Sequence, residues 1–386
     1  MPRIPIAANT ASTVTINGRD LVAFGGCNYL GLGHHPDVKA SVVRAMDYLG
    51  LTTSASRETS GNTLEHELLE AELAQFLGME ASILMPEGYT ANLALAQALA
   101  APEAWPAGGG DPPVAVIDEK SHRSIRNAVE ASGFEVADFE HLSAADAMRV
   151  IRRHTDRRVC VWTDGVFAAD GAIAPLPGLL AAMPRNNALL VVDDCHGFCV
   201  LGTRGRGTCE HFGISDPRIL WTSTLAKGLG CYGGAVASSR RLIGVVRDHA
   251  GIYKGTTPVP PILAHAAREA LRVIDREADL VSRLEANVRR IRRSLAAMGL
   301  PVEDSPSPVM TFVLDSAQRM RSFYDRLIAQ DVFIPLIDYP NGPAPLYFRL
   351  SVCAMHSPGQ IDHLLRSLET ALADTASLAC QARAAG

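Results

Sequence analysis

The chain has 386 residues, of which 47% are hydrophobic and 20% charged, and its formal net charge is −5. This length allows a large buried core divided over two or three domains. The small negative charge argues against nucleic acid or an anionic membrane surface as a partner. The first residues lack the apolar stretch of a signal peptide, and no apolar run could span a bilayer. We therefore expect a cytoplasmic protein.

Cysteine and arginine positions set two further expectations. The 8 cysteines are scattered, without a CxxC pair or a Cys/His cluster, so free thiols and no metal site are predicted. Four arginines follow one another closely between 289 and 293, in a helical pattern with Ile291 and Leu295. Such a charge run is typical of a solvated helix face.

The first part of the chain alternates between short apolar runs and helical patterns. Residues 13–24 predict a hairpin, because Asn17-Gly18 is a strong two-residue turn signal. Apolar runs and helices then follow in alternation, which indicates a mostly parallel sheet covered on both faces. The helices are expected at 36–48, 64–76, 89–99 and 121–131, and the apolar runs at 83–85, 114–117, 159–162, 189–192 and 219–222.

The second part predicts a smaller α/β unit. A helical stretch over 261–295 leads into it, and strands at 309–314 and 346–351 alternate with helices at 320–329 and from 358 onward. The Pro/Gly-rich residues 101–113 are interpreted as a surface loop within the first part. The predicted segments are 1–45 (hairpin and helix), 46–285 (large domain) and 286–386 (small C-terminal domain).

Polar residues stand where predicted strands end, which is where open α/β sheets bind ligands. In Pro86–Asn92, Gly88 opens a helix and allows close backbone approach, so the free N–H groups there, with Tyr89 and Thr90, could bind a phosphate. An ordinary strand–helix turn is the alternative.

A second segment places Asp193 and His196 after an apolar strand. A buried carboxylate at this position suits a cofactor with a pyridinium nitrogen, because the charge pair keeps the ring protonated and electron-poor. His196 could reach a phenolic oxygen of the same ring. A divalent-metal site is the competing interpretation, although further ligands at useful spacing are missing.

A third segment, Thr222–Gly230, contains Lys227 among small residues after a strand. This lysine is well placed to form an imine, and the hydroxyls of Ser223 and Thr224 could hold a phosphate. The phosphate-loop pattern is absent because Gly228 follows the lysine. An exposed loop lysine is the alternative. His122, near another strand end, could stack on an aromatic cofactor, although a lone histidine is more often structural or solvated.

An ordered set of short segments gives the chain a specific resemblance. The segments are NYLGL at 28, SRETSG at 56, EGYTAN at 87, TDGVFAADG at 163, DDCHG at 193, LGTRGRGT at 201, TSTLAKGLG at 222, TTPVPP at 256 and FRLSVCAMH at 348. With them the chain resembles the α-oxoamine synthases, enzymes that depend on pyridoxal 5′-phosphate (PLP). The resemblance implies the fold type I (aspartate aminotransferase-like) α/β fold, with a mostly parallel seven-stranded sheet and a smaller C-terminal α/β domain. It also implies a homodimer with a shared active site.

The resemblance further implies a role for each matching residue. Lys227 corresponds to the Schiff-base lysine and is the expected base, Asp193 to the partner of the pyridine nitrogen, His196 to the residue at the phenolic oxygen and His122 to the ring-stacking histidine. The other cofactor residues implied are Gly88, Tyr89 and Thr224 at the phosphate, Thr257 from the second subunit, and Asp164. Asn28 and Arg349 correspond to substrate contacts, and a planar guanidinium suits bidentate binding of the amino-acid carboxylate.

The implied reaction joins an amino acid to an acyl thioester, either acyl-CoA or an acyl-carrier protein, usually with loss of CO₂, and gives an α-amino ketone. Ala168 stands where the family usually has Ser, Cys195 where Ala is common, and the N-terminus is short. These departures favour a specialised member that serves a secondary metabolite or signal. Alternatives are 8-amino-7-oxononanoate synthase or glycine C-acetyltransferase of primary metabolism, a PLP-dependent aminotransferase or aldolase, and a non-catalytic relative.

Overall fold

A computed structural model describes residues 4–105 and 111–384, with side chains described as far as residue 375. The chain forms two compact units. The large unit comprises 35–167 and 173–278, and the small unit comprises 1–34, 168–172 and 279–386. These units differ from the three predicted segments, because the N-terminal hairpin pairs with a C-terminal strand whereas the helix after it belongs to the large unit.

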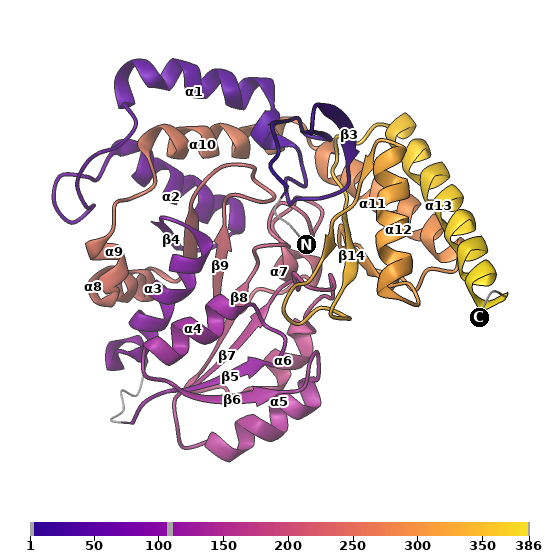
Figure 1. The fold of residues 1–386 in the computed structure, drawn as a ribbon. Helices are drawn as coiled ribbons and strands as arrows, with labels where there is room; N and C mark the ends of the chain where they lie inside the picture. The colour runs from indigo at the N-terminus through magenta and orange to yellow at the C-terminus, as the bar shows by residue number, and fades with distance from the viewer. Residues whose placement is uncertain (1–3, 106–110, 385–386) are drawn as a thin grey trace. The chain divides into compact units, whose positions relative to one another are not determined.

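A seven-stranded sheet forms the centre of the large unit (Figure 1). Its strand order is β4-β10-β9-β8-β7-β5-β6, with β10 antiparallel to both neighbours and the other pairings parallel. The predicted mostly parallel sheet is therefore confirmed. The strands are β4 (Ala81–Met85), β5 (Val114–Asp118), β6 (Glu135–Phe139), β7 (Val159–Asp164), β8 (Ala188–Asp193), β9 (Ile219–Thr224) and β10 (Gly234–Ser238).

Helices cover this sheet because its central strands are buried on both faces. Every residue of β5, β7 and β8 is buried, as expected for parallel strands between helical layers. Helices α3, α4 and α8 share one core cluster, and α1 packs on α10, which packs on α2. The helices are α1 (Pro36–Leu49), α2 (Leu64–Leu77), α3 (Gly88–Ala100), α4 (Arg123–Ala131), α5 (Ala144–Ile151), α6 (Leu176–Ala182), α7 (Thr208–His211), α8 (Arg240–His249), α9 (Gly251–Gly255) and α10 (Pro261–Arg276), with short 3-10 turns at Pro102–Ala104 and Arg152–His154.

The small unit contains two sheets and three long helices. Asn17 and Gly18 both have positive φ, 50° and 76°, which confirms the predicted hairpin turn. The strand order is β1-β2-β3-β12 in one sheet and β11-β14-β13 in the other. The elements are β1 (Ala8–Asn9), β2 (Thr13–Ile16), β3 (Arg19–Ala23), a 3-10 turn at Leu32–His34, α11 (Asp279–Ala297), β11 (Val309–Phe312), α12 (Ala317–Ala329), β12 (Val332–Phe333), β13 (Leu336–Ile337), β14 (Tyr347–Ser351) and α13 (Pro358–Ala384).

Two local predictions were wrong. The helix expected over 261–295 is two helices, because Glu277 leaves the helical conformation and α11 restarts with Asp279, whose carboxylate suits a helix N-terminus. The arginine run is not entirely solvated. Arg292 is buried, and its guanidinium donates to the carbonyls of Ser307 and Val309, both at 2.8 Å. Burial lowers the pKa of Arg292 to about 10.

The predicted surface loop at 101–113 is described in part. Pro102–Ala104 forms a 3-10 turn and Trp105 is buried, whereas residues 106–110 lie outside the described residues. Residues 1–3 and the side chain of Cys380 also lie outside them. Within the described part of the chain, no helix is long and apolar enough to cross a membrane.

Candidate active site

Three neighbouring strands of the large unit bring polar side chains to one end of the sheet. The strand register places Asp164, the last residue of β7, beside Asp193 at the end of β8, and Asp193 beside Thr222 of β9. Parallel strands share their carboxyl ends, which is why segments far apart in the sequence meet here. The structure thus brings these residues together at the strand ends, which is where the sequence predicts the site.

Lys227 and His196 meet on adjacent loops. The Lys227 Nζ atom lies 2.8 Å from the His196 Nε2 atom. The lysine loop is closed by backbone hydrogen bonds from Cys231 to Leu225 and from Gly230 to Lys227, both 2.9 Å. A Cβ atom at Gly228 would lie 2.2 Å from the carbonyl oxygen of Phe198. Only glycine permits this close approach of the two loops.

Asp193 is buried and receives two N–H donors. Its Oδ1 accepts from the backbone N–H of Cys195 at 3.1 Å, and its Oδ2 accepts from Nδ2 of Asn92 at 2.7 Å. Sequence reasoning did not assign a role to Asn92. The available signal was its place one helical turn after Gly88, since residues four apart share a helix face.

His122 sits at the N-terminus of α4 and is anchored by its backbone and its ring. Its N–H donates to Oδ2 of Asp164 at 2.8 Å, and its Nδ1 lies 2.7 Å from Oγ of Ser124. Burial lowers the pKa of His122, the charge of Asp193 opposes this shift and that of Lys227 reinforces it. Both charges act on one imidazole, so the three predicted residues share one site.

Asp164 is a second buried carboxylate close to this group. Burial raises the pKa of Asp164 well above its usual range, and the charge of Asp193 adds to the increase. The backbone N–H of His122 and the charge of Lys227 act in the opposite direction. The structure thus places Asp164 beside the other predicted cofactor residues.

The predicted phosphate residues lie where α3 begins. A Cβ atom at Gly88 would lie only 3.0 Å from Cβ of Thr224, so the helix start is pressed against the end of β9. The first N–H groups of a helix have no partner within the helix and favour anions. The Thr224 hydroxyl accepts from the N–H of Ala226 at 3.1 Å, Tyr89 is partly exposed, and Thr257 is exposed in the segment between α9 and α10.

The two predicted substrate residues belong to the small unit. On β14, Arg349 donates from Nε to the carbonyl oxygen of Ala168 at 2.8 Å, and its Nη2 lies 4.0 Å from Sγ of Cys27. Among the described residues Arg349 forms no ion pair with a carboxylate. Nδ2 of Asn28 lies 3.2 Å from Nδ1 of His34.

Two of the three departures from the family pattern, Cys195 and Ala168, have defined contacts in the structure. Sγ of Cys195 accepts from the N–H of Thr224 at 3.1 Å, and burial raises the pKa of this thiol well above its usual range. These contacts agree with a small packed residue and argue against a reactive thiolate. At position 168 the backbone carbonyl, which any residue would supply, is what binds Arg349.

The donor set of the large unit fits PLP. A buried carboxylate is available for a pyridinium nitrogen, an amine for an aldehyde, and a helix N-terminus pressed against Thr224 for a phosphate. Among the described residues, no group of His, Cys, Asp and Glu side chains is arranged to hold a metal ion.

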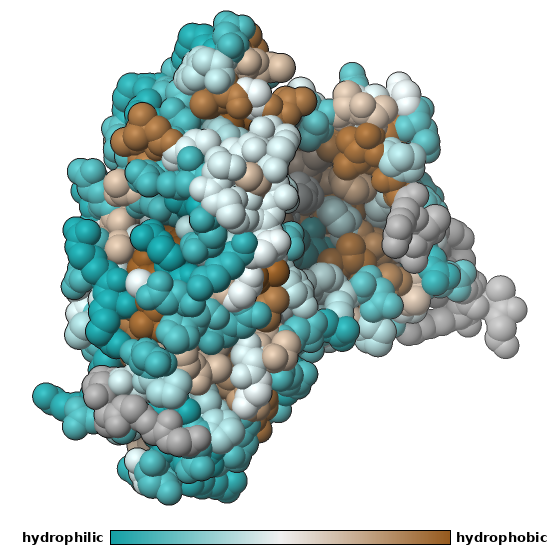
Figure 2. Space-filling model, turned by 90° about the vertical axis from the view of Figure 1, so that its left-hand side faces the viewer, coloured by the Kyte–Doolittle hydropathy of each residue, from teal (hydrophilic) through white to brown (hydrophobic). Residues whose placement is uncertain are grey.

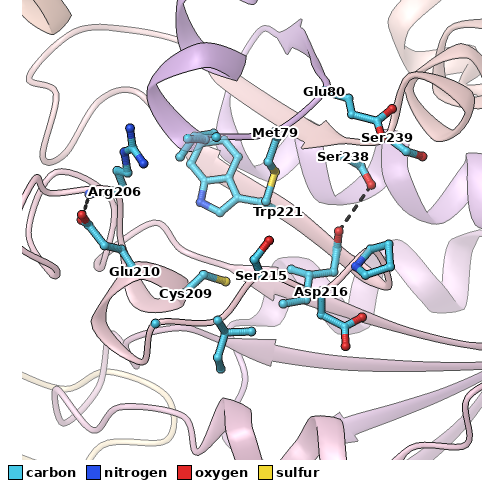
Figure 3. Close-up of a pocket in the computed structure, with 16 residues that line it drawn as sticks. Met79, Glu80, Arg206, Cys209, Glu210, Ser215, Asp216, Trp221, Ser238 and Ser239 are labelled. Carbon is cyan, nitrogen blue, oxygen red and sulfur yellow. Dashed lines mark hydrogen bonds between the residues drawn. The ribbon is translucent and has the colours of Figure 1, made fainter.

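A pocket of about 500 Å³ lies at the opposite end of the sheet, around the start of β9 and the end of β10. Figure 3 shows Arg206 and Glu210 on one side of it and Glu80, Ser238 and Asp216 on the other. Its three carboxylates are already engaged. Glu80 and Glu210 accept backbone N–H groups at 3.1 and 2.9 Å, and Asp216 pairs with Arg218 at 2.7 Å. None of the residues that line this pocket belongs to the Lys227 group, so the two are separate.

Comparison with known proteins gives consistent relatives. Residues 19–368 match the family model "Aminotransferase class I and II". The chain is 36% identical to 8-amino-7-oxononanoate synthase of Methylococcus capsulatus, over 93% of this chain and 91% of the relative, and 34% identical to that of Thioalkalivibrio sulfidiphilus, over 92% and 90%. The serine palmitoyltransferase structure of Sphingomonas wittichii superposes with a TM-score of 0.90 at 27% identity, covering 97% of this chain and 93% of the other.

The chain therefore belongs to the class I and II aminotransferase family. Its large and small units together form the fold of that family. Within it, the chain is an α-oxoamine synthase, a PLP-dependent acyltransferase.

Proposed function

We propose that this enzyme condenses an amino acid with an acyl thioester, releases CO₂ and the free thiol, and forms an α-amino ketone. The observation that carries the proposal is the Lys227–His196 pair beside buried Asp193, together with a guanidinium in the small unit that has no carboxylate partner among the described residues. Bound PLP would supply an electron sink for the electrons released at the amino-acid Cα.

Lys227 is the residue that would hold the cofactor and remove the Cα proton. Its Nζ is the nitrogen that would link to the aldehyde, and His196, at 2.8 Å, fixes its direction. A base must lie within hydrogen-bond reach of the proton that it accepts. The short loop that Gly228 allows keeps the amine near the strand ends where the cofactor would lie.

Asp193 and the start of α3 would hold the two ends of the cofactor. Asp193 would pair with the pyridine nitrogen, while Gly88, Tyr89 and Thr224 would bind the phosphate, with Thr257 from a second subunit. Asp164 positions His122 because its Oδ2 accepts a hydrogen bond from the backbone N–H of His122 at 2.8 Å. His122 would then cover one face of the ring.

Arg349 would bind the carboxylate of the amino acid. The carbonyl of Ala168 accepts from its Nε at 2.8 Å, and the side chains of Tyr29 and Cys27 lie beside the guanidinium. A planar guanidinium binds a carboxylate through two parallel hydrogen bonds. Asn28, in the same unit, would contact the substrate as well.

The test is a matrix of amino acids and acyl thioesters assayed for thiol and CO₂ release by the PLP-loaded enzyme. The acyl groups should vary in length and in the presence of a terminal carboxylate, each as CoA and carrier-protein thioesters. Stoichiometric thiol and CO₂ release is expected for at least one pair. Conversion of bound PLP to the pyridoxamine form, without thiol release, would instead establish an aminotransferase.

The preferred amino acid and acyl thioester distinguish a primary-metabolism enzyme from a specialised one. The relatives named 8-amino-7-oxononanoate synthase favour that reaction in primary metabolism, whereas Ala168 and Cys195 favour a specialised member that makes a secondary metabolite or signal. Efficient turnover of only the substrates that give 8-amino-7-oxononanoate would support the first. Preference for another acyl chain or amino acid would support the second.

A homodimer is part of the proposal, and exposed apolar side chains support it. Five apolar side chains on α1, after it and at the start of α2 are each more than half exposed, namely Val43, Met46, Tyr48, Leu51 and Leu64. Figure 2 shows hydrophobic residues exposed among hydrophilic ones in the upper part of the molecule. Exposed apolar side chains that gather on one segment are typical of interfaces. Sedimentation should give a dimer for the wild type and a monomer for a Val43→Glu/Met46→Lys variant, and a monomeric wild type would refute it.

A further inference from the structure

A buried amide at the centre of the large unit connects two of the proposed cofactor residues. Asn92 is fully buried on α3. Its Nδ2 donates to Oδ2 of Asp193 at 2.7 Å and to Oγ of Ser124 at 2.9 Å, and its Oδ1 accepts from the hydroxyl of Thr222 at 2.7 Å. Both amide hydrogens and the carbonyl oxygen therefore have partners, as buried polar groups require.

The direction of each hydrogen bond follows from the donors available. A carboxylate only accepts, so the amide nitrogen must face Asp193 and the amide oxygen must face Thr222. The second amide hydrogen then points at the Ser124 oxygen. Because that oxygen accepts from Asn92, the serine hydrogen is free to point at the next acceptor.

That acceptor is the ring of His122. Oγ of Ser124 lies 2.7 Å from Nδ1 of His122, and the backbone N–H of Ser124 also points at Nδ1 from 3.3 Å. Two donors directed at one ring nitrogen require that nitrogen to be unprotonated. Burial favours the neutral ring, since it lowers the pKa of His122.

We infer that Asn92 and Ser124 are positioning residues that orient the Asp193 carboxylate and hold His122 as the neutral tautomer with its hydrogen on Nε2. With Nδ1 occupied by Ser124 and a hydrogen on Nε2, His122 is a donor and does not serve as the base. The inference rests on the proposed function, and it leaves proton removal to Lys227. One polar network thus sets both the pyridine-nitrogen partner and the residue over the ring.

The first experiment measures the histidine tautomer without any turnover. The holoenzyme with ¹⁵N-labelled histidine is studied by ¹⁵N NMR, and the His122 signals are identified as those lost in His122→Gln. The wild type should show hydrogen on Nε2 and a bare Nδ1. Ser124→Ala should shift this pattern toward a tautomer mixture, and Ser124→Thr, which keeps the hydroxyl, should restore it. Hydrogen on Nδ1 in the wild type, or an unchanged pattern in Ser124→Ala, would overturn the inference.

The second experiment separates the two arms of the network by PLP affinity. Replacing Asn92 by Leu removes the donor to Asp193, so the dissociation constant of PLP should rise about tenfold, the effect of one lost hydrogen bond to a charged group. Ser124→Ala keeps that donor and should leave the constant within about threefold. Equal effects of the two variants would contradict the assignment.

A matched control is available on β4. Ser82 is also a buried serine, and its hydroxyl donates to the carbonyl of Glu70 at 2.7 Å, remote from His122 in the hydrogen-bond network. Ser82→Ala should lower the thermal midpoint without changing the His122 signals or PLP affinity. Because neither readout uses an acyl thioester, a failure of the network and a failure of the proposed reaction are distinguishable.

Discussion

The two units hold their candidate site residues in different ways. In the large unit, polar side chains already bind one another, in the series His122, Ser124, Asn92, Asp193 and in the Lys227–His196 pair. In the small unit, Arg349 donates to the carbonyl of Ala168 and lies beside Cys27 and Tyr29, and among the described residues it forms no ion pair with a carboxylate. The first arrangement suits a resident cofactor, which needs a fixed frame, and the second suits a substrate that binds and leaves.

The largest effect is expected from removing the amine of the large unit. Lys227→Ala should abolish the visible absorbance of the covalently held cofactor and reduce thiol release by at least about 10³-fold, because both cofactor linkage and proton removal are lost. Lys254→Ala, at an exposed lysine of the same unit, is the control and should retain both. Substantial activity in Lys227→Ala would remove the lysine from the mechanism.

A weaker and more selective loss is expected in the small unit. Arg349→Lys keeps the charge but loses the two parallel hydrogen bonds, so KM for the amino acid should rise about 10- to 100-fold. PLP affinity should not change, since the cofactor residues lie in the large unit. Steady-state kinetics and PLP titration measure the two effects, with the exposed Arg366→Lys as control. A loss of PLP affinity in place of amino-acid affinity would contradict the division between units.

One buried group in each unit should also change the free energy of unfolding with pH, and the two changes have opposite signs. In the small unit His356 is buried, its Nδ1 accepts from the N–H of Cys353 at 3.0 Å, and burial lowers its pKa from 6.5 to about 4. As pH falls, the His356 imidazole is protonated at a higher pH in the unfolded chain than in the folded chain. The contribution of His356 to the free energy of unfolding should therefore decrease by about 3 kcal/mol between pH 6.5 and 4. Denaturant titrations should show this change in the difference in unfolding free energy between wild type and His356→Gln.

Asp194 should give the reverse slope in the large unit. It is buried, accepts from the N–H of Thr208 at 2.9 Å, and burial raises its pKa from 3.8 to about 6. Its contribution is complete below pH 3.8 and is lost as pH rises through about 6, a decrease of about 3 kcal/mol. The difference in unfolding free energy between wild type and Asp194→Asn should change with pH in this direction. A pH-independent difference would show that Asp194 does not titrate as its burial implies.

Within the large unit, the sequence predicted the buried strands better than the edge strand and the buried polar contacts, for physical reasons. Parallel strands buried on both faces appear as unbroken apolar runs, so β7 and β8 were visible, and the strand ends then located Asp193 and Lys227. Strand β6 lies at the sheet edge with four of its five residues exposed or half-buried, and gave no such run. Asn92 was missed because its role depends on contacts with residues 32, 101 and 130 positions away. Spacing along one helix does not reveal such partners.

The smallest effect is expected at position 168, where one substitution tests both the amino-acid KM and the affinity for PLP. Its carbonyl holds Arg349 through the backbone, so Ala168→Ser should leave the amino-acid KM unchanged. The added hydroxyl could restore the hydrogen bond near the cofactor that the family pattern implies, worth about 1 kcal/mol, or roughly fivefold in PLP affinity. Titration of PLP into wild-type and Ala168→Ser apoprotein measures it. A large change in amino-acid KM with unchanged PLP affinity would mean that the side chain at 168 acts on the substrate and not on the cofactor.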